Sequence, residues 1–447
     1  MRDCFLVIKH NLILLGILWL TLACVPEKSA PTVPMIDPPD FDNQVDSLVT
    51  VWLKDNLKPL AGIEPQPTNG DLLPFATALG SKPYVLLGES ATGTMELAGL
   101  KQRLISYMVS VKDFKLVLIE MPFQKSLAIN AFVLGGSGDA ATILDETDVW
   151  WMSTLDMVTF VNSLRAYNQT VVEAEKVRVL GMDMLQPAGS IVALSDYLQS
   201  VDAGLATFVL AQQGCFLPYQ DDAEGYFQLP LSTRQACAAN MQSVVDTLTT
   251  DVNRLAGLSS EEEAQNALQH ALIVVQAEQV FGASISGSGR LLRQRSMAIN
   301  VKAFAERFSS RAVVWTDNYA SAFFPVQNKT LAANLTEMTS DADVLKVGMS
   351  FFNGELYLNS SGIKGTESLQ VTSDAPFASC ENYIATTNRT LGYLSTIGVS
   401  AGSVRTDWLF EGLGIRQQDG ITQTILSREF DLFFYVETCS PSRLFVR

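Results

Sequence analysis

The 447-residue sequence contains only two histidines, His10 and His270, and this shortage restricts the chemistry available to it. A serine hydrolase needs a histidine beside its nucleophile, and no Gly-x-Ser-x-Gly turn occurs either. The sequence has no Cys-x-x-Cys or His-Glu-x-x-His motif, which argues against a dedicated zinc site. Basic residues are also scarce: 31 Lys and Arg against 47 Asp and Glu give a net charge of −16, which argues against nucleic-acid binding.

The N-terminal segment lacks an apolar run long enough to cross a bilayer. Leu12–Ala23 is a largely apolar stretch of 12 residues preceded by Arg2 and Lys9, whereas a membrane span needs about 20 residues. This pattern is typical of a signal peptide. The segment ends in Thr-Leu-Ala followed by Cys24, which resembles the cleavage box of bacterial lipoproteins, and plain secretion is the alternative.

A proline-rich stretch follows Cys24 and has little that could form a core, which is typical of an extended tether. We therefore expect a lipoprotein signal peptide over residues 1–23, a lipidated Cys24 with its tether over 24–45, and a folded domain over 46–447. The anchor would hold this domain at the membrane of a bacterial cell envelope, facing the periplasm, and we expect the outer membrane.

Four other cysteines remain in the mature chain, namely Cys215, Cys237, Cys380 and Cys439. An even number of cysteines in an exported protein indicates disulfides, and four cysteines allow three pairings. Closeness in sequence favours Cys215–Cys237 and Cys380–Cys439.

Apolar, β-branched runs recur along the domain and are separated by helical patterns. They lie at residues 84–87, 115–119, 177–180, 312–315 and 344–348, with a last one at 430–436. This alternation predicts an α/β fold with a central sheet covered by helices on both faces. Residues 186–289 lack a strand signal and predict a helical insertion, either a lid over the sheet edge or a structural layer. His270 lies within it among apolar residues, which favours a packing role.

The first apolar run leads directly into a polar turn. Tyr84–Leu87 reads as a buried strand, Gly88-Glu89-Ser90 follows it, and a helical pattern covers residues 95–109. A strand that ends in such a turn places side chains at the carboxyl edge of a sheet, where open α/β folds bind ligands. Glu89 therefore lies either in an active-site turn or in a solvated loop.

Residues 88–94 resemble the Gly-Glu-Ala-Thr-His-Gly-Thr turn of the erythromycin esterase family. The likeness continues through residues 100–104 and 114–139, and further matches occur in the family's order as far as Asn318. These matches are Trp150-Trp151, residues 164–168, residues 181–184, Arg293, Met297-Ala298, Asn300 and Trp315. The resemblance implies the fold of that family and an ester hydrolase that uses histidine to activate water.

The chain departs from this family at its histidines. Thr92 stands where the family's turn has a histidine, and a hydroxyl holds its proton too tightly to act as a base. The family's Trp-Ala-His-Asn-x-His motif reads Trp-Thr-Asp-Asn-Tyr-Ala over residues 315–320. Asp317 and Ala320 therefore replace the two histidines of that motif.

Four acidic residues follow the ends of predicted strands: Glu89, Glu120, Asp183 and Asp317. The resemblance implies Glu89, Glu120, Asp317 and Thr92 as catalytic candidates, and Arg103, Asp183, Arg293 and Asn318 as substrate-binding candidates. Crowded carboxylates raise one another's pKa, so that one of them becomes a general base or acid. They also suit a divalent cation, although no cofactor is required. In the alternative, the site has lost its chemistry: Arg103 and Arg293 pair with the acidic residues, which then neither transfer protons nor bind a cation.

Two functions are compatible with these residues. The first is a degenerate hydrolase that binds a small ligand or a partner, and the second is an active hydrolase of cyclic or other carboxylic esters, such as a macrolide. In the second, Glu120 or Asp317 would be the base. The hydrolase requires Glu89, Glu120, Asp317 and Thr92 to meet in one open pocket that neither Tyr319 nor Phe323 fills.

Overall fold

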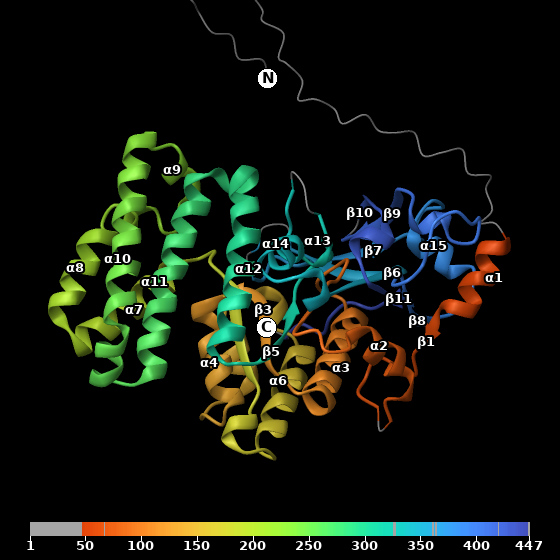
Figure 1. Cartoon of the computed structure of the whole chain (residues 1–447), viewed down its shortest axis with the longest axis horizontal. Helices are drawn as coiled ribbons and strands as arrows, with labels where there is room; N and C mark the ends of the chain where they lie inside the picture. Colours follow the sequence, from red (N-terminus) through yellow and green to blue (C-terminus); the bar gives the residue numbers. More distant parts are fainter. Residues whose placement is uncertain are drawn as a thin grey trace, which may run out of the picture. The chain divides into compact units, whose positions relative to one another are not determined.

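A computed structural model describes residues 47–445 except 67, 325–327, 360, 361, 363 and 419 (Figure 1). The predicted signal peptide, Cys24 and the tether lie outside the described residues. In the described part, none of the helices is both long and apolar enough to cross a lipid bilayer.

The core is a mixed sheet in the order β1-β8-β11-β6-β2-β5-β3-β4, with β7 paired to the far end of β6. The six strands from β11 to β4 run parallel, whereas β1, β7 and β8 are antiparallel to their neighbours. The bounds are β1 (Lys58–Pro59), β2 (Tyr84–Leu87), β3 (Phe114–Pro122), β4 (Arg178–Asp183), β5 (Arg311–Trp315), β6 (Val344–Leu358), β7 (Ser368–Thr372), β8 (Leu391–Ser395) and β11 (Leu432–Cys439). A separate hairpin joins β9 (Leu413–Gln417) and β10 (Gly420–Thr424).

Helices cover both faces of this sheet because its strand residues alternate between two apolar cores. Val85 and Leu87 of β2 pack against α2 (Leu73–Leu79), α3 (Met95–Lys112) and α6 (Leu155–Asn168). Tyr84 and Leu86 face the opposite core, which includes α12 (Gly289–Arg307) and α14 (Leu331–Met338). The predicted α/β fold class is therefore confirmed, and the run at residues 84–87 is confirmed as a strand with both faces buried.

Six further α-helices of the described chain surround the sheet. They are α1 (Ser47–Asn56), α4 (Phe123–Val133), α5 (Ala140–Glu146), α13 (Asn318–Ser321), α15 (Cys380–Ala385) and α16 (Leu426–Glu429). Helix α1 and helix α15 form a third apolar core with the other face of β8 and β11.

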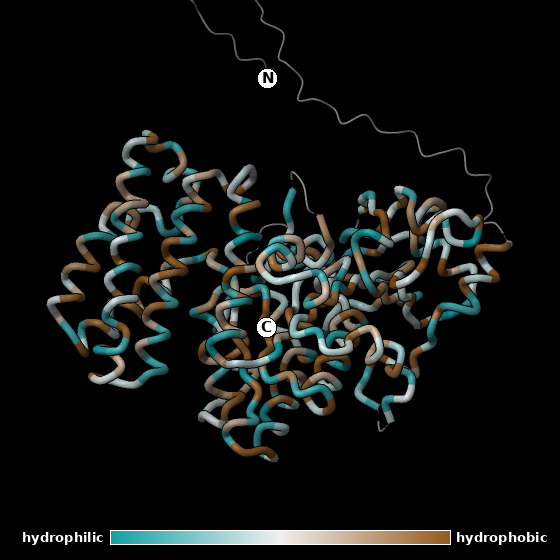
Figure 2. Tube along the Cα trace, in the orientation of Figure 1, coloured by the Kyte–Doolittle hydropathy of each residue, from teal (hydrophilic) through white to brown (hydrophobic). Residues whose placement is uncertain are grey.

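Residues 188–282 form five α-helices and no strand. They are α7 (Ala188–Val201), α8 (Ala203–Gln213), α9 (Ala223–Phe227), α10 (Leu231–Leu258) and α11 (Glu261–Gly282). Hydrophobic and hydrophilic residues alternate along them (Figure 2), as expected for helices with one buried side. His270 is buried there, with its Nδ1 3.1 Å from the Ser190 hydroxyl and its ring against Phe123. Burial lowers the pKa of His270 to about 4, so this side chain is a neutral packing residue.

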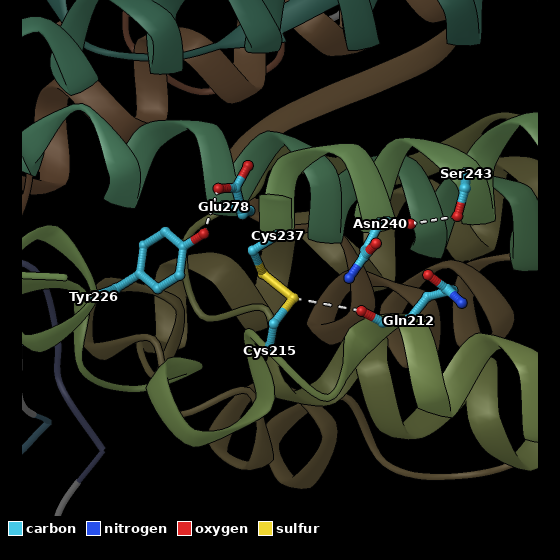
Figure 3. Close-up of a disulfide and its surroundings, with 7 residues drawn as sticks. All are labelled: Gln212, Cys215, Tyr226, Cys237, Asn240, Ser243 and Glu278. Carbon is cyan, nitrogen blue, oxygen red and sulfur yellow. Dashed lines mark hydrogen bonds between the residues drawn. A yellow bond between two sulfur atoms is a disulfide. The ribbon is translucent and has the colours of Figure 1, made fainter. Parts of the chain in front are cut away.

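A disulfide joins Cys215, after α8, to Cys237 in α10 (Figure 3), as closeness in sequence predicted. The predicted Cys380–Cys439 disulfide is wrong, because both cysteines are buried and free. Cys380 begins α15 and packs in the core with Phe433 and Tyr435, whereas Cys439 belongs to the core on the other face of the sheet. Strand β11 therefore separates the two thiols.

Candidate functional site

Four neighbouring parallel strands end in acidic residues at the same edge of the sheet. Glu89 follows β2, Asp317 follows β5, Glu120 lies near the end of β3, and Asp183 ends β4. Because the strand order is β2-β5-β3-β4, the four carboxylates form a row in the order Glu89, Asp317, Glu120, Asp183. This edge is where open α/β sheets bind ligands. We call these four residues the carboxylate row.

Close packing of β3 and β4 sets the position of Glu120. The β3–β4 register shifts between Ile119 and Pro122, so β3 bulges at Glu120. Gly181 of β4 makes the bulge possible, because a Cβ at this position would lie 2.5 Å from the carbonyl oxygen of Met121. A side chain at residue 181 would therefore push the two strands apart.

Arg293 of α12 binds the two carboxylates at one end of the row. Its Nη2 lies 2.7 Å from Oε1 of Glu120 and 2.7 Å from Oδ2 of Asp183, and its Nε lies 3.1 Å from Oδ1 of Asp183. Burial opposes the charge of Arg293, but Asp183 and Glu120 outweigh that effect and raise its pKa. The main-chain N–H groups of Met184 and Leu185 also donate to Asp183 Oδ1. These partners satisfy both oxygens of Asp183.

Lys101 of α3 binds the other end of the row. Its ammonium lies 3.2 Å from Oε2 of Glu89 and donates to the carbonyl oxygen of Thr316 at 2.7 Å. It also lies 4.9 Å from the centre of the Trp315 ring. The Thr92 hydroxyl donates to Glu89 Oε1 at 3.1 Å. Burial raises the pKa of Glu89 and lowers that of Lys101, and in each case the partner's charge opposes the shift.

Thr316 connects the two ends of the row. Its carbonyl oxygen accepts from Lys101, and its hydroxyl donates to Oε2 of Glu120. Glu120 is therefore bound through both oxygens, one by Arg293 and the other by Thr316. Only Asp317 has no cation within bonding distance in the described structure.

Asp317 caps the short helix α13, and its Oδ1 accepts from the main-chain N–H of Ala320 at 2.7 Å. Burial raises the pKa of Asp317 to about 7, and the negative charge of Glu120 adds to the shift. The N–H of Ala320, Arg293 and Lys101 oppose it. The pKa of Asp317 is therefore near neutral pH, and this carboxyl group has no cation at bonding distance among the described residues.

The row borders two cavities, and Trp151 lines both of them. The larger, of about 170 Å³, is lined by Glu120 and Asp183 and also by Asp148, Trp150, Trp151 and Gln186. The smaller, of about 10 Å³, is lined by Glu89, Thr92, Trp151, Thr154, Trp315 and Ser442. A space of this size holds at most one water molecule. Helices α7–α11 contribute no lining residue to either cavity, whereas Gln186, at the start of the predicted insertion, lines the larger one.

The hydrolase required its four catalytic candidates to meet in one open pocket, and the structure brings them together only in part. Glu120 lies on the larger cavity and Glu89 with Thr92 on the smaller one, whereas Asp317 lines neither. Tyr319 and Phe323 do not fill the larger cavity. The Tyr319 ring instead stacks on Phe324 at 6.3 Å, and Phe323 lies under the ammonium of Lys346.

Two predicted substrate-binding residues are structural. Arg103 does not join the row: its guanidinium binds Asp71 and the carbonyl oxygen of Gly62, and its side chain is 2% exposed. Asn318 is also buried, and its side-chain amide exchanges two hydrogen bonds with the main chain of Met349 in β6. The amide of Asn318 therefore fixes the turn after β5 against β6 and is not available to a ligand.

Among the described residues, no group of three or more histidines, cysteines, aspartates and glutamates is placed to hold a metal ion. Arg293 and Lys101 bind the carboxylates that a divalent cation would need. The described part of the chain therefore offers no set of ligands for a divalent cation at the carboxylate row.

Sequence reasoning missed Lys101 and Thr316. Lys101 lies four residues after Leu97 and three before Leu104, both of which are buried, so helical periodicity placed it on the buried face of α3. A lysine on such a face needs a buried anion, and this signal was present in the sequence. Thr316 had no comparable signal, because a threonine after a strand has many ordinary roles.

The family model described as erythromycin esterase matches residues 109–439, which is more than half of the chain. The chain belongs to the erythromycin esterase family. A solved structure from Bacillus cereus has 22% identity and a TM-score of 0.76, and it covers 91% of this chain and 100% of its own. The solved structure of a succinoglycan biosynthesis protein has 19% identity and a TM-score of 0.77. This match covers 89% of the present chain and 98% of the chain of that protein.

A histidine-to-asparagine variant of an erythromycin esterase, solved in its open conformation, has 13% identity and a TM-score of 0.64. It covers 84% of this chain and 96% of its own. At these low identities the three structures show a shared fold alone. The family and the fold together support a hydrolase-like architecture for this erythromycin esterase homologue.

Proposed function

We propose that this erythromycin esterase homologue is an exported lipoprotein whose site binds a small ligand and has lost ester hydrolysis. One observation carries the proposal: Arg293 binds Glu120 and Asp183, two of the three carboxylates on the wall of the larger cavity. A general base must be free to take a proton and must lie within hydrogen-bond reach of it. Glu120 has Arg293 and Thr316 on its two oxygens, so it is a poor base.

The lining of the larger cavity defines the chemistry of the ligand. Glu120, Asp148 and Asp183 supply acceptors, Gln186 adds an amide, and no lysine or arginine is among the lining residues. Trp150 and Trp151 supply flat aromatic surface. Such a wall suits a small ligand that carries several O–H or N–H donors and one face for packing on an indole. The negative charge of this lining disfavours the binding of anions.

A second function is supported by Asp317. A carboxyl group with a pKa of about 7 is suited to general acid–base catalysis at neutral pH. In this alternative, Asp317 or Glu120 activates water for attack on a cyclic or other carboxylic ester, such as a macrolide. Asp317 is partly exposed but lines neither cavity, so neither cavity brings a substrate to it.

Thermal unfolding of the purified protein with added compounds tests the binding proposal. The panel is neutral mono- and disaccharides, alkylammonium ions and, as a negative control, carboxylates of similar size. A ligand at 100 times its Kd stabilises the folded state by about 2.7 kcal/mol. We expect stabilisation by a donor-rich class that is lost in Trp150→Ala and kept in Glu262→Gln, a change at an exposed glutamate of α11. Stabilisation by the carboxylates alone would contradict the proposal.

Ester hydrolysis, measured with a macrolide and with p-nitrophenyl acetate, tests the alternative. We expect no turnover above that of heat-inactivated protein. Turnover that disappears in both Glu120→Gln and Asp317→Asn, with Glu262→Gln unaffected, would contradict the binding proposal and establish carboxylate-based hydrolysis. The two variants also distinguish an enzyme from a contaminating esterase, whose activity neither change would alter.

The proposed export is tested separately at Cys24. In a bacterial host that processes lipoproteins, the protein should incorporate labelled palmitate and sediment with membranes. Cys24→Ser should abolish the label and release the protein from the membrane fraction. Equal membrane association of both forms without label would contradict a lipid anchor.

A further inference from the structure

The segment that follows β11, residues 440–445, crosses the turn that carries Glu89. We call it the C-terminal strap. Met95 donates its main-chain N–H to the carbonyl of Ser440 at 2.9 Å, and Ser440 donates to Oε2 of Glu96 at 2.6 Å. Ser442 then donates to the carbonyl of Gly93 at 2.9 Å. The first half of the strap is therefore bound to the start of α3.

The second half of the strap is bound to the start of α6. Leu155 donates to the carbonyl of Arg443 at 2.9 Å, and Phe445 donates to the carbonyl of Ser153 at 3.2 Å. Asp156 accepts from the main-chain N–H of Arg443 at 3.1 Å and from its guanidinium. Arg443 therefore fastens the strap through both its main chain and its side chain.

This route closes the smaller cavity. Ser442 lines that cavity together with Glu89 and Thr92, and the walls that the strap joins contribute Gly93 and Thr154. The strap thus spans the gap between α3 and α6 above the bound Glu89–Lys101 pair. The match to the erythromycin esterase family ends at Cys439, immediately before the strap.

We propose that the C-terminal strap is a removable cover, and that its release opens the Glu89 pocket to solvent and ligand. The proposal goes beyond the proposed function, because the Glu89 pocket is the smaller cavity, whereas the proposed ligand is assigned to the larger one. Opening does not require the sheet to unfold, because the strap lies beyond β11 and is bound through main-chain hydrogen bonds and one ion pair. The Arg443 side chain is 56% exposed, so salt weakens that pair.

Opening is measured with a thiol placed under the strap. Met157 lines the smaller cavity, lies in α6 and is 2% exposed, so Met157→Cys buries a thiol there. Its reaction with methyl methanethiosulfonate forms a mixed disulfide and releases methanesulfinate, and peptide mass spectrometry reports the rate. Adding Arg443→Ala should speed this reaction about tenfold, because the buried Asp156 loses its charge partner. Adding 1 M sodium chloride should speed it in the Met157→Cys protein more than in the double variant.

Three comparisons make the result specific to the strap. Arg405→Ala removes an exposed arginine elsewhere and should leave the rate unchanged. The native thiol of Cys380, in the core on the other face of the sheet, reports global unfolding and should stay unreactive. Ala98→Cys, on the α3 wall of the same cavity, is a second reporter if Met157→Cys destabilises the protein.

A variant that ends at Cys439 gives the decisive result. If it keeps the parent's circular dichroism and its introduced thiol reacts at least tenfold faster, the strap is the cover. If that variant and Arg443→Ala both leave the thiol as unreactive as before, the proposal is overturned. No ligand or substrate takes part in these measurements, so failure of the proposed function would not affect them.

Discussion

Arg293 binds Asp183 through two nitrogens, with Nε at 3.1 Å and Nη2 at 2.7 Å from its two oxygens. This two-point contact holds a guanidinium from α12 at the carboxyl end of β4 and fixes the orientation of both groups. The same Nη2 reaches Glu120 at the end of β3. One side chain therefore neutralises one end of the carboxylate row and joins a helix to two strands.

Removing this guanidinium should destabilise the protein. Arg293→Met keeps the length of the side chain but leaves Glu120 and Asp183 partly buried without their cation, so the free energy of unfolding should fall by about 3 kcal/mol. Urea unfolding measures the change. Arg178→Met is the matched control, because Arg178 has the same 23% side-chain exposure but pairs with a 55% exposed Glu262. It should cost less than about 1 kcal/mol, and equal costs would contradict the importance of the buried pairing.

The disulfide between Cys215 and Cys237 should stabilise the helical layer. It closes a loop over a sequence separation of 22, and a loop of this size contributes about 3 kcal/mol by restricting the unfolded chain. The double variant Cys215→Ala/Cys237→Ala should therefore unfold at lower denaturant concentration than the oxidised protein. A reducing agent should lower the stability of the parent and leave that of the double variant unchanged. A further loss in the double variant would mean that the reductant acts elsewhere.

The sequence predicted the sheet edge well because the parallel strands are short, apolar and buried on both faces. Tyr84–Leu87 is a strand at the predicted bounds, and Glu89, Glu120, Asp183 and Asp317 lie at one edge as the predicted strand ends required. Any acidic residue that follows such a run reaches that edge, whatever its role. The fold class and the carboxylate row were therefore predictable, whereas the partner of each carboxylate was not.

Arg103 shows why the partners could not be read from sequence. It lies two residues after Lys101, and residues two apart on a helix point to different sides. Lys101 therefore reaches Glu89, while Arg103 points away and binds Asp71. The Cys380–Cys439 error has a related cause, because nearness along the chain does not reveal which face of the sheet a thiol occupies. Both choices depend on tertiary packing.

The turn between Glu89 and α3 depends on Gly93. Its φ of +91° disfavours a side chain, and a Cβ would lie 2.6 Å from the carbonyl oxygen of Tyr357 and 2.8 Å from the Trp150 ring. Gly93→Ala should therefore lower the free energy of unfolding by about 2 kcal/mol and weaken the strap, because Ser442 bonds to the carbonyl of Gly93.

The control for this change is Gly257→Ala, in α10, where a Cβ would meet no atom within 4 Å. Alanine in place of a helical glycine stabilises by up to about 1 kcal/mol, so this variant should unfold at the same or a higher urea concentration than the parent. A Gly93→Ala protein as stable as the Gly257→Ala protein would show that the turn accommodates a side chain.

The raised pKa of Asp317 makes a definite prediction for the dependence of stability on pH. The pKa rises from an ordinary value of 3.8 to about 7 in the folded protein, so the folded state holds a proton that the unfolded state has released. The contribution of this bound proton to the free energy of unfolding is fully present below about pH 4 and is lost as the pH rises through 7. The slope reaches about 1.4 kcal/mol per pH unit between these limits.

Asp317→Asn should remove this slope and keep the cap on α13, because an asparagine oxygen also accepts from the N–H of Ala320. The variant should therefore gain stability over the parent as the pH rises from 4 to 7, measured by urea unfolding across that range. Asp139→Asn is the matched control: Asp139 caps α5 by accepting from Thr142, and these hydrogen bonds lower its pKa. Its contribution is present above pH 4 and is lost in acid, so this variant should show no gain between pH 4 and 7. If Asp317→Asn behaves as Asp139→Asn does, Asp317 is ionised at neutral pH, and the alternative in which it serves as a general base with a near-neutral pKa loses its support.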